Sequence, residues 1–132
     1  MLHVALDDRM VCDTGAAAAL LAPALTGLER EEFHVLHLDE NLAFIGHEIY
    51  AAGSAGMVDV PMRQLIRDAL TLESRALILA HNHPDDSLEP SRADKAVTKR
   101  IVETARPLGI MVLDHLIFGR RDWMSFRRTG LI

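Results

Sequence analysis

Residues 76–84 read ALILAHNHP, an apolar run that ends in two histidines and a proline. A short continuous apolar run of this kind is typical of a buried β-strand. Side chains alternate between the two faces of a strand, so His81 and His83 should point to the same face at the strand's end. At that separation, one metal ion could bind both imidazoles.

A carboxylate that could complete this site follows eleven residues after His83, at Asp94, beyond a loop rich in turn-forming residues. Catalytic zinc sites usually have three protein ligands and leave the fourth position open to water. His81, His83 and Asp94 therefore form the predicted metal site, with Zn²⁺ as the expected cofactor. Iron and manganese remain open on ligand type alone.

The pattern AHNHP, followed by PSRAD and later by VLDHLIFG and SFRRTGLI, resembles the JAMM motif of JAB/MPN metallopeptidases, and the RadC-like branch in particular. The resemblance covers residues 28–132 and implies a single α/β domain of the JAB/MPN (cytidine-deaminase-like) type. Residues 1–27 are expected to form an N-terminal helical extension, too short for the helix-hairpin-helix module of longer RadC-like proteins. Asp85-Asp86 departs from similar sequences, which usually carry small residues such as Ser-Gly after the proline.

Hydrophobic patterning is consistent with such a domain. It predicts helices over 16–25, 61–70 and 91–105, with Asp13 or Thr14 as the first cap and Ser91 as the last. It predicts strands over 33–39, 42–50, 76–80, 110–118 and 123–126. Strands and helices mixed in this order indicate a central mixed sheet flanked by helices.

The resemblance also implies a catalytic carboxylate that takes a proton from water and passes it to the leaving amine. Glu31-Glu32-Phe33 matches the family's Glu at the start of the first strand, which favours Glu31. Glu32 and Glu48 are the alternatives. Ser91 would donate a hydrogen bond to the oxyanion or to the zinc-bound water, unless its role is helix capping alone.

The remaining histidines, His3, His34, His37 and His47, lack ligand spacing, so we expect them at the surface. The pair Asp114-His115 matches a family D-H pair in a strand. It could orient the metal ligands or make structural hydrogen bonds, and we favour the structural role.

Composition fits a soluble domain: 132 residues, 49% hydrophobic, a net charge of −5 and a single cysteine, Cys12, which fits a reducing compartment. No apolar run is long enough to cross a bilayer, and acidic residues precede residues 16–25, so we expect neither a membrane span nor a signal peptide. Residues 1–91 carry five basic and 15 acidic side chains, whereas residues 92–132 carry nine basic and four acidic ones.

These observations predict a cytoplasmic zinc-dependent hydrolase that cleaves an amide or isopeptide bond in a protein or peptide substrate. The alternative is a DNA-associated, repair-linked protein of the RadC-like family, whose metal site is directed at nucleic acid or vestigial. The basic C-terminal third favours this alternative, and the acidic balance of residues 1–91 opposes it. Sequence leaves the oligomeric state open.

Overall fold

The computed structural model describes residues 13–51 and 60–132. Its centre is a five-stranded sheet in the order β2-β1-β3-β4-β5. The strands are β1 (Glu32–Leu38), β2 (Phe44–Ala51), β3 (Ala76–Asn82), β4 (Met111–Phe118) and β5 (Trp123–Ser125). Only β3 and β4 pair in parallel, and the other neighbours are antiparallel. The sheet is therefore mixed, as the sequence predicts.

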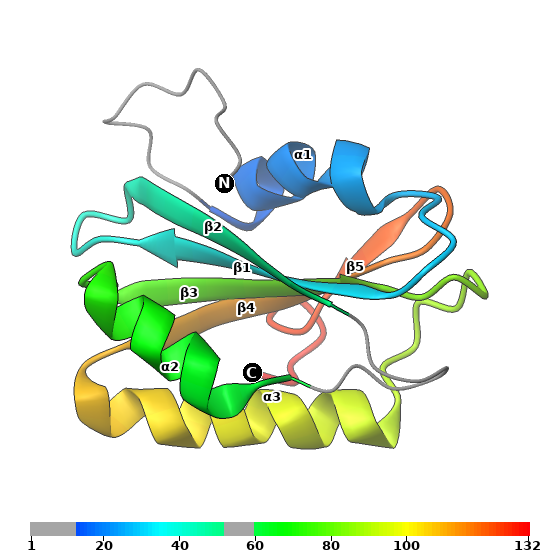
Figure 1. Cartoon of the computed structure of the whole chain (residues 1–132). Coiled ribbons are helices and arrows are strands. Elements are labelled where there is room, and N and C mark those ends of the chain that lie inside the picture. The colour runs from blue at the N-terminus through cyan, green and yellow to red at the C-terminus, as the bar shows by residue number, and fades with distance from the viewer. Residues whose placement is uncertain (1–12, 52–59) are drawn as a thin grey trace.

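Helices cover both faces of this sheet (Figure 1). Helix α1 (Thr14–Leu25) lies on one face, and α2 (Met62–Thr71) and α3 (Arg92–Ala105) lie on the other. A short 3₁₀ turn, Arg106–Leu108, follows α3. Because both faces of β3 are covered, all seven of its residues are buried, which explains the continuous apolar run in the sequence.

The core is divided by the sheet into two layers. On the α1 face, Leu21 packs with alternate strand residues such as Leu36 and Ile78. On the α2/α3 face, Leu65 and Ile101 pack with a second set of core residues. These two sets follow from the period-two alternation of each strand.

One irregularity in β4 changes which side chains reach which face. Leu77 of β3 pairs with Val112, but the next residue, Ile78, pairs with Asp114, so Leu113 is an extra residue in the ladder. Such a bulge shifts all later side chains to the opposite face. As a result, His115 lies on the α2/α3 face, the same face as His81.

The predicted first helix is present, and Asp13 rather than Thr14 is its cap, accepting a hydrogen bond from the backbone N–H of Ala16 at 2.8 Å. Leu21 and Leu25 are fully buried against the sheet. The predicted division of the chain at residue 28 stays a prediction, and Cys12 lies outside the described residues. Among the described residues, no helix is long and apolar enough to span a membrane.

Candidate metal centre

The two histidines of the opening motif meet at the end of β3. His81 is within the strand and buried, and His83 is just past its end and partly exposed. Their Nε2 atoms lie 3.0 Å apart. The alternation of strand side chains therefore places both imidazoles on one face, as predicted.

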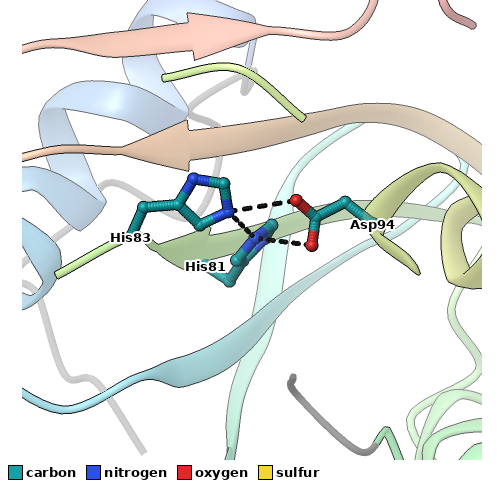
Figure 2. A group of neighbouring side chains, drawn as sticks. All are labelled: His81, His83 and Asp94. Carbon is teal, nitrogen blue, oxygen red and sulfur yellow. Dashed lines mark hydrogen bonds and ion pairs between the residues drawn. The ribbon is translucent and has the colours of Figure 1, made fainter. Parts of the chain in front are cut away.

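The start of α3 brings Asp94 to the same point (Figure 2). Ser91 is the N-cap, its hydroxyl accepts the Asp94 N–H at 3.0 Å, and the Asp94 carboxylate accepts the Ser91 N–H at 2.8 Å. This reciprocal capping box holds Asp94 in the first turn. Its Oδ1 lies 3.1 Å from His81 Nε2 and its Oδ2 lies 3.0 Å from His83 Nε2.

The two imidazole nitrogens and the carboxylate suit a small tetrahedral ion, and one ligand atom from each residue lies within 4.8 Å of the others. Atoms about 2.0–2.1 Å from a tetrahedral zinc ion lie roughly 3.3 Å from one another. The two Nε2 atoms lie 3.0 Å apart, and each lies 3.0 to 3.1 Å from a different oxygen of the Asp94 carboxylate. Only a small outward movement would be needed to admit an ion, so the residues fit the metal that the motif implies. Among the described residues, this is the group of histidines and carboxylates that could hold a metal ion.

A metal-binding histidine usually donates its other ring N–H to a fixed acceptor. The Nδ1–H of His83 donates to the backbone carbonyl of Ser87 at 2.8 Å. A carbonyl can only accept, so this bond leaves the Nε2 of His83 as the atom that faces Asp94. Nδ1 of His81 instead lies 2.8 Å from Nε2 of His115, a fully buried residue.

The electrostatics of the centre favour an ionised carboxylate. Burial raises the pKa of Asp94, but the neighbouring imidazoles of His81 and His83 lower it more, so the pKa lies well below its usual range. The hydrogen bond with Asp94 also raises the pKa of His83. Burial has the opposite effect on His115, whose pKa falls well below its ordinary value.

Glu31 lies directly before β1 and is half-buried. Phe33 pairs with His81 at the end of the antiparallel ladder, and Glu31 lies two residues before Phe33. Alternation also puts Glu31 on the face of Phe33, which stacks with His81 at a ring separation of 6.2 Å. Glu31 therefore lies on the face of the sheet that carries the metal centre, and its role as general base stays a prediction.

The two alternative carboxylates are placed differently. Glu32 points to the other face of the sheet, where it contacts Arg30 at 3.1 Å and His34 at 3.0 Å. Glu48 is on the edge strand β2 opposite Val35, and Val35 in turn pairs with Leu79 rather than with a histidine.

Asn82 is a site residue that the sequence analysis did not single out. Its side chain is buried, and its Oδ1 accepts the backbone N–H of Glu32 at 2.8 Å. Its Nδ2 donates to the carbonyls of Leu28 and Arg30 at 3.0 and 2.8 Å. These three bonds fix the backbone on both sides of Glu31. The sequence contains a signal for this role. A polar strand residue between two histidines points to the opposite face of the sheet, where it is buried and needs hydrogen-bond partners.

Ser91 is exposed, and the bond that involves its hydroxyl is the helix cap described above. As an acceptor of one N–H, the hydroxyl keeps its own hydrogen available for a further bond. Donation to an oxyanion stays a prediction.

Three of the four remaining histidines are not at the surface, so that expectation was wrong. His34 and His37 are fully buried and His47 nearly so. Part of their hydrogen-bonding capacity is satisfied: His34 Nδ1 contacts His47 Nε2, and His37 Nδ1 contacts Ser74 Oγ, each at 2.8 Å. His3 lies outside the described residues.

Asp114 and His115 have different roles: Asp114 makes structural hydrogen bonds, whereas His115 contacts a predicted metal ligand. Asp114 is structural, because its carboxylate accepts hydrogen bonds from the Thr14 and Ser125 hydroxyls and from the backbone N–H groups of His115 and Arg127. These bonds join α1, β4 and the segment after β5. His115, expected to be structural, instead contacts the predicted ligand His81, because the bulge in β4 turns it to that face.

Asp85 and Asp86, which replace the small residues usual in similar sequences, both make hydrogen bonds that shape the loop after Pro84. Asp86 has a left-handed backbone (φ 69°), the conformation that glycine adopts most readily, and its carboxylate accepts the backbone N–H of Arg120 at 2.6 Å. Asp85 accepts the N–H of Ser87 at 3.1 Å. A β-carbon on Gly119 would lie 2.6 Å from the Asp86 carboxylate, so the approach of the two loops requires glycine there.

The mixed α/β domain, with two histidines at the end of a central strand and an aspartate at the start of a helix, has the architecture of a JAB-type domain. The three residues could hold a metal ion. The family is identified directly: the RadC-like JAB domain matches residues 11–131. The chain belongs to that family, as its motifs predict.

Proposed function

We propose that this protein is a zinc-dependent hydrolase that cleaves an amide or isopeptide bond in a protein or peptide. The observation that carries the proposal is the convergence of His81 Nε2, His83 Nε2 and the Asp94 carboxylate within 3.0–3.1 Å of one another. The capping box and the hydrogen bonds of His81 and His83 hold these atoms in place before any ligand binds.

Zinc bound by these three residues would supply a water whose pKa is lowered to about 7 and would polarise the scissile carbonyl. The work of the chain itself is proton transfer and orientation. Glu31, two residues before the His81 partner Phe33 and on the same face, accepts the proton of the attacking water and delivers it to the leaving amine. Asn82 keeps Glu31 in place through the flanking backbone groups.

Ser91 contributes a hydrogen-bond donor. Its hydroxyl accepts the Asp94 N–H and retains its own hydrogen, which we assign to the oxygen that becomes negative as water adds to the carbonyl. This role is separable from capping, because threonine would keep both functions and asparagine would keep the cap without the hydroxyl.

The experiment is a comparison of Glu31→Gln with Glu32→Gln. Purified wild type is screened against fluorogenic peptide amides and isopeptide-linked peptides, with zinc content measured in parallel. Glu31→Gln should retain zinc and lose activity by a factor on the order of 10²–10⁴, the usual value of general acid–base catalysis. Glu32→Gln, the matched control on the opposite face, should stay within a few-fold of wild type.

A silent Glu31→Gln beside an inactive Glu32→Gln would contradict the proposed base. DNA is the essential counter-substrate. Nuclease activity that is lost in His83→Ala, together with no cleavage of any amide, would replace the proposal with the nucleic-acid alternative. We expect weak DNA binding at most, because Asp85 and Glu89 are exposed on the loop beside the centre and would repel phosphates.

A further inference from the structure

A buried chain of hydrogen bonds connects two of the three predicted ligands behind the site. Nδ1 of His81 lies 2.8 Å from Nε2 of His115, and Nδ1 of His115 lies 2.5 Å from Oγ1 of Thr98. The Thr98 hydroxyl in turn contacts the backbone carbonyl of Asp94 at 2.7 Å. The side chains of His81, His115 and Thr98 are each at least 97% buried, so water does not substitute for these partners.

The last bond sets the direction of the others. A carbonyl oxygen can only accept, so the single hydrogen of the Thr98 hydroxyl is donated to Asp94, one turn earlier in α3. Thr98 Oγ1 must then accept from Nδ1–H of His115. The His115 ring is fully buried, and its two nitrogens face Thr98 and His81, neither of which is a carboxylate that would hold a charged ring. With its hydrogen on Nδ1, its Nε2 accepts from Nδ1–H of His81. This order leaves the Nε2 of His81 directed at Asp94 and His83.

Packing keeps the His115 ring in this orientation. Phe126 stacks on one side at a ring separation of 4.6 Å, and Phe33 contacts it edge-on at 5.6 Å. Phe33 also stacks with His81. The ring therefore has little freedom to rotate toward other partners.

We propose that Thr98 and His115 are positioning residues for the metal centre: Thr98 holds His115 in the tautomer that carries hydrogen on Nδ1, and His115 holds His81 with Nε2 facing the ion. The chain also ties the His81 ring to the backbone of Asp94, which fixes the spacing of two ligands that come from different elements. The inference rests on the proposed metal centre for its functional meaning, but the tautomer of His115 does not depend on a metal.

The test uses Thr98→Val, which has nearly the same shape without the hydroxyl, and Thr98→Ser, which restores the hydroxyl. In wild type, ¹⁵N–¹H NMR of the histidine rings should show His115 with hydrogen on Nδ1, the less common tautomer of free histidine, both without metal and with zinc. Thr98→Val should shift His115 toward the Nε2–H tautomer and weaken zinc binding by about 10–100-fold, as loss of an outer partner does. Thr98→Ser should restore the tautomer and most of the affinity.

A wild-type His115 with hydrogen on Nε2 would overturn the inference, as would a Thr98→Val variant that binds zinc as tightly as wild type. A change in packing alone would not move the tautomer, so this readout separates positioning from stability. If wild type binds no zinc, the proposed function fails, while the metal-free NMR result still decides whether the hydrogen-bond chain runs in the stated direction.

Discussion

Each face of the sheet has a pair of contacting histidines, and the two pairs differ in what they can bind. His81 and His83 lie with ring centres 4.8 Å apart, and His34 and His47 lie 4.9 Å apart. In the first pair the two Nε2 atoms face each other and Asp94. In the second pair the side chains form a row of hydrogen bonds. Glu32 contacts Nε2 of His34, and Nδ1 of His34 contacts Nε2 of His47.

The row cannot hold an ion in the same way. Both nitrogens of His34 already face partners in opposite directions, and Nδ1 of His47 is buried without a hydrogen-bond partner among the described residues. The comparison shows that proximity of imidazoles is not sufficient for a metal site. Each ring also needs an outer acceptor that directs its free nitrogen, and a carboxylate must arrive from another element.

The largest expected difference between the two pairs is in zinc affinity. His83→Ala removes a ligand and should weaken zinc binding by more than the roughly 10–100-fold typical of an outer partner. His47→Ala, the matched change in the other pair, should leave affinity unchanged while it destabilises the fold, because it leaves a cavity beside His34. Competition with a chromophoric chelator measures the affinities, and denaturant unfolding measures stability. Equal zinc loss in both variants would show that the convergent geometry does not define the site.

The second prediction concerns acid stability. Burial lowers the pKa of His37 and of His47 to about 4, from an ordinary value of 6.5. The unfolded chain therefore binds more protons than the folded one between these values, and stability should fall as pH decreases from about 6.5 to 4, by up to about 3 kcal/mol per residue. The free energy of unfolding, measured in denaturant across this range, should show the loss.

His37→Asn is the control for this effect. An asparagine can keep a hydrogen bond with Ser74 but does not titrate, so the variant should lose less stability on acidification than wild type. An equally steep loss in the variant would show that other groups determine the acid sensitivity.

The smallest expected effect concerns the loop that supports His83. Asp86→Ala removes the acceptor of the Arg120 N–H and leaves a non-glycine residue with a left-handed backbone, so we expect a loss of about 1–2 kcal/mol. Asp86→Asn keeps an acceptor oxygen and a residue that tolerates this conformation, so it should stay near wild type. Denaturant unfolding compares the two. Equal losses would mean that the hydrogen bond to Arg120 contributes nothing.

The parts of the centre that could be predicted from sequence are those governed by short-range rules. Alternation along β3 placed His81 and His83 together, and the capping pattern at Ser91 placed Asp94 in the first turn of α3. The strands and helices follow the predicted order, with β3 extending two residues further than predicted, through Asn82.

What could not be predicted depends on contacts between distant segments. The bulge at Leu113 decides that His115 faces His81, and no local pattern in β4 marks an extra residue. The burial of His34 and His37 involves contacts with other segments: His34 with His47 on β2, and His37 with Ser74 ahead of β3. The hydrogen bonds of the Asn82 side chain with the backbone of residues 28–32 likewise form only once β1 and β3 are paired.

The capping box has a kinetic consequence. Asp94 Oδ2 is shared between the Ser91 N–H at 2.8 Å and His83 Nε2 at 3.0 Å, so one carboxylate both starts a helix and faces the ligands. Helix ends fray more often than helix centres, and local opening costs less than global unfolding. Each opening of the first turn of α3 would withdraw Asp94 from the histidines. Opening of this turn would leave an ion with two ligands in place of three, so we expect its frequency to influence how fast the ion is released.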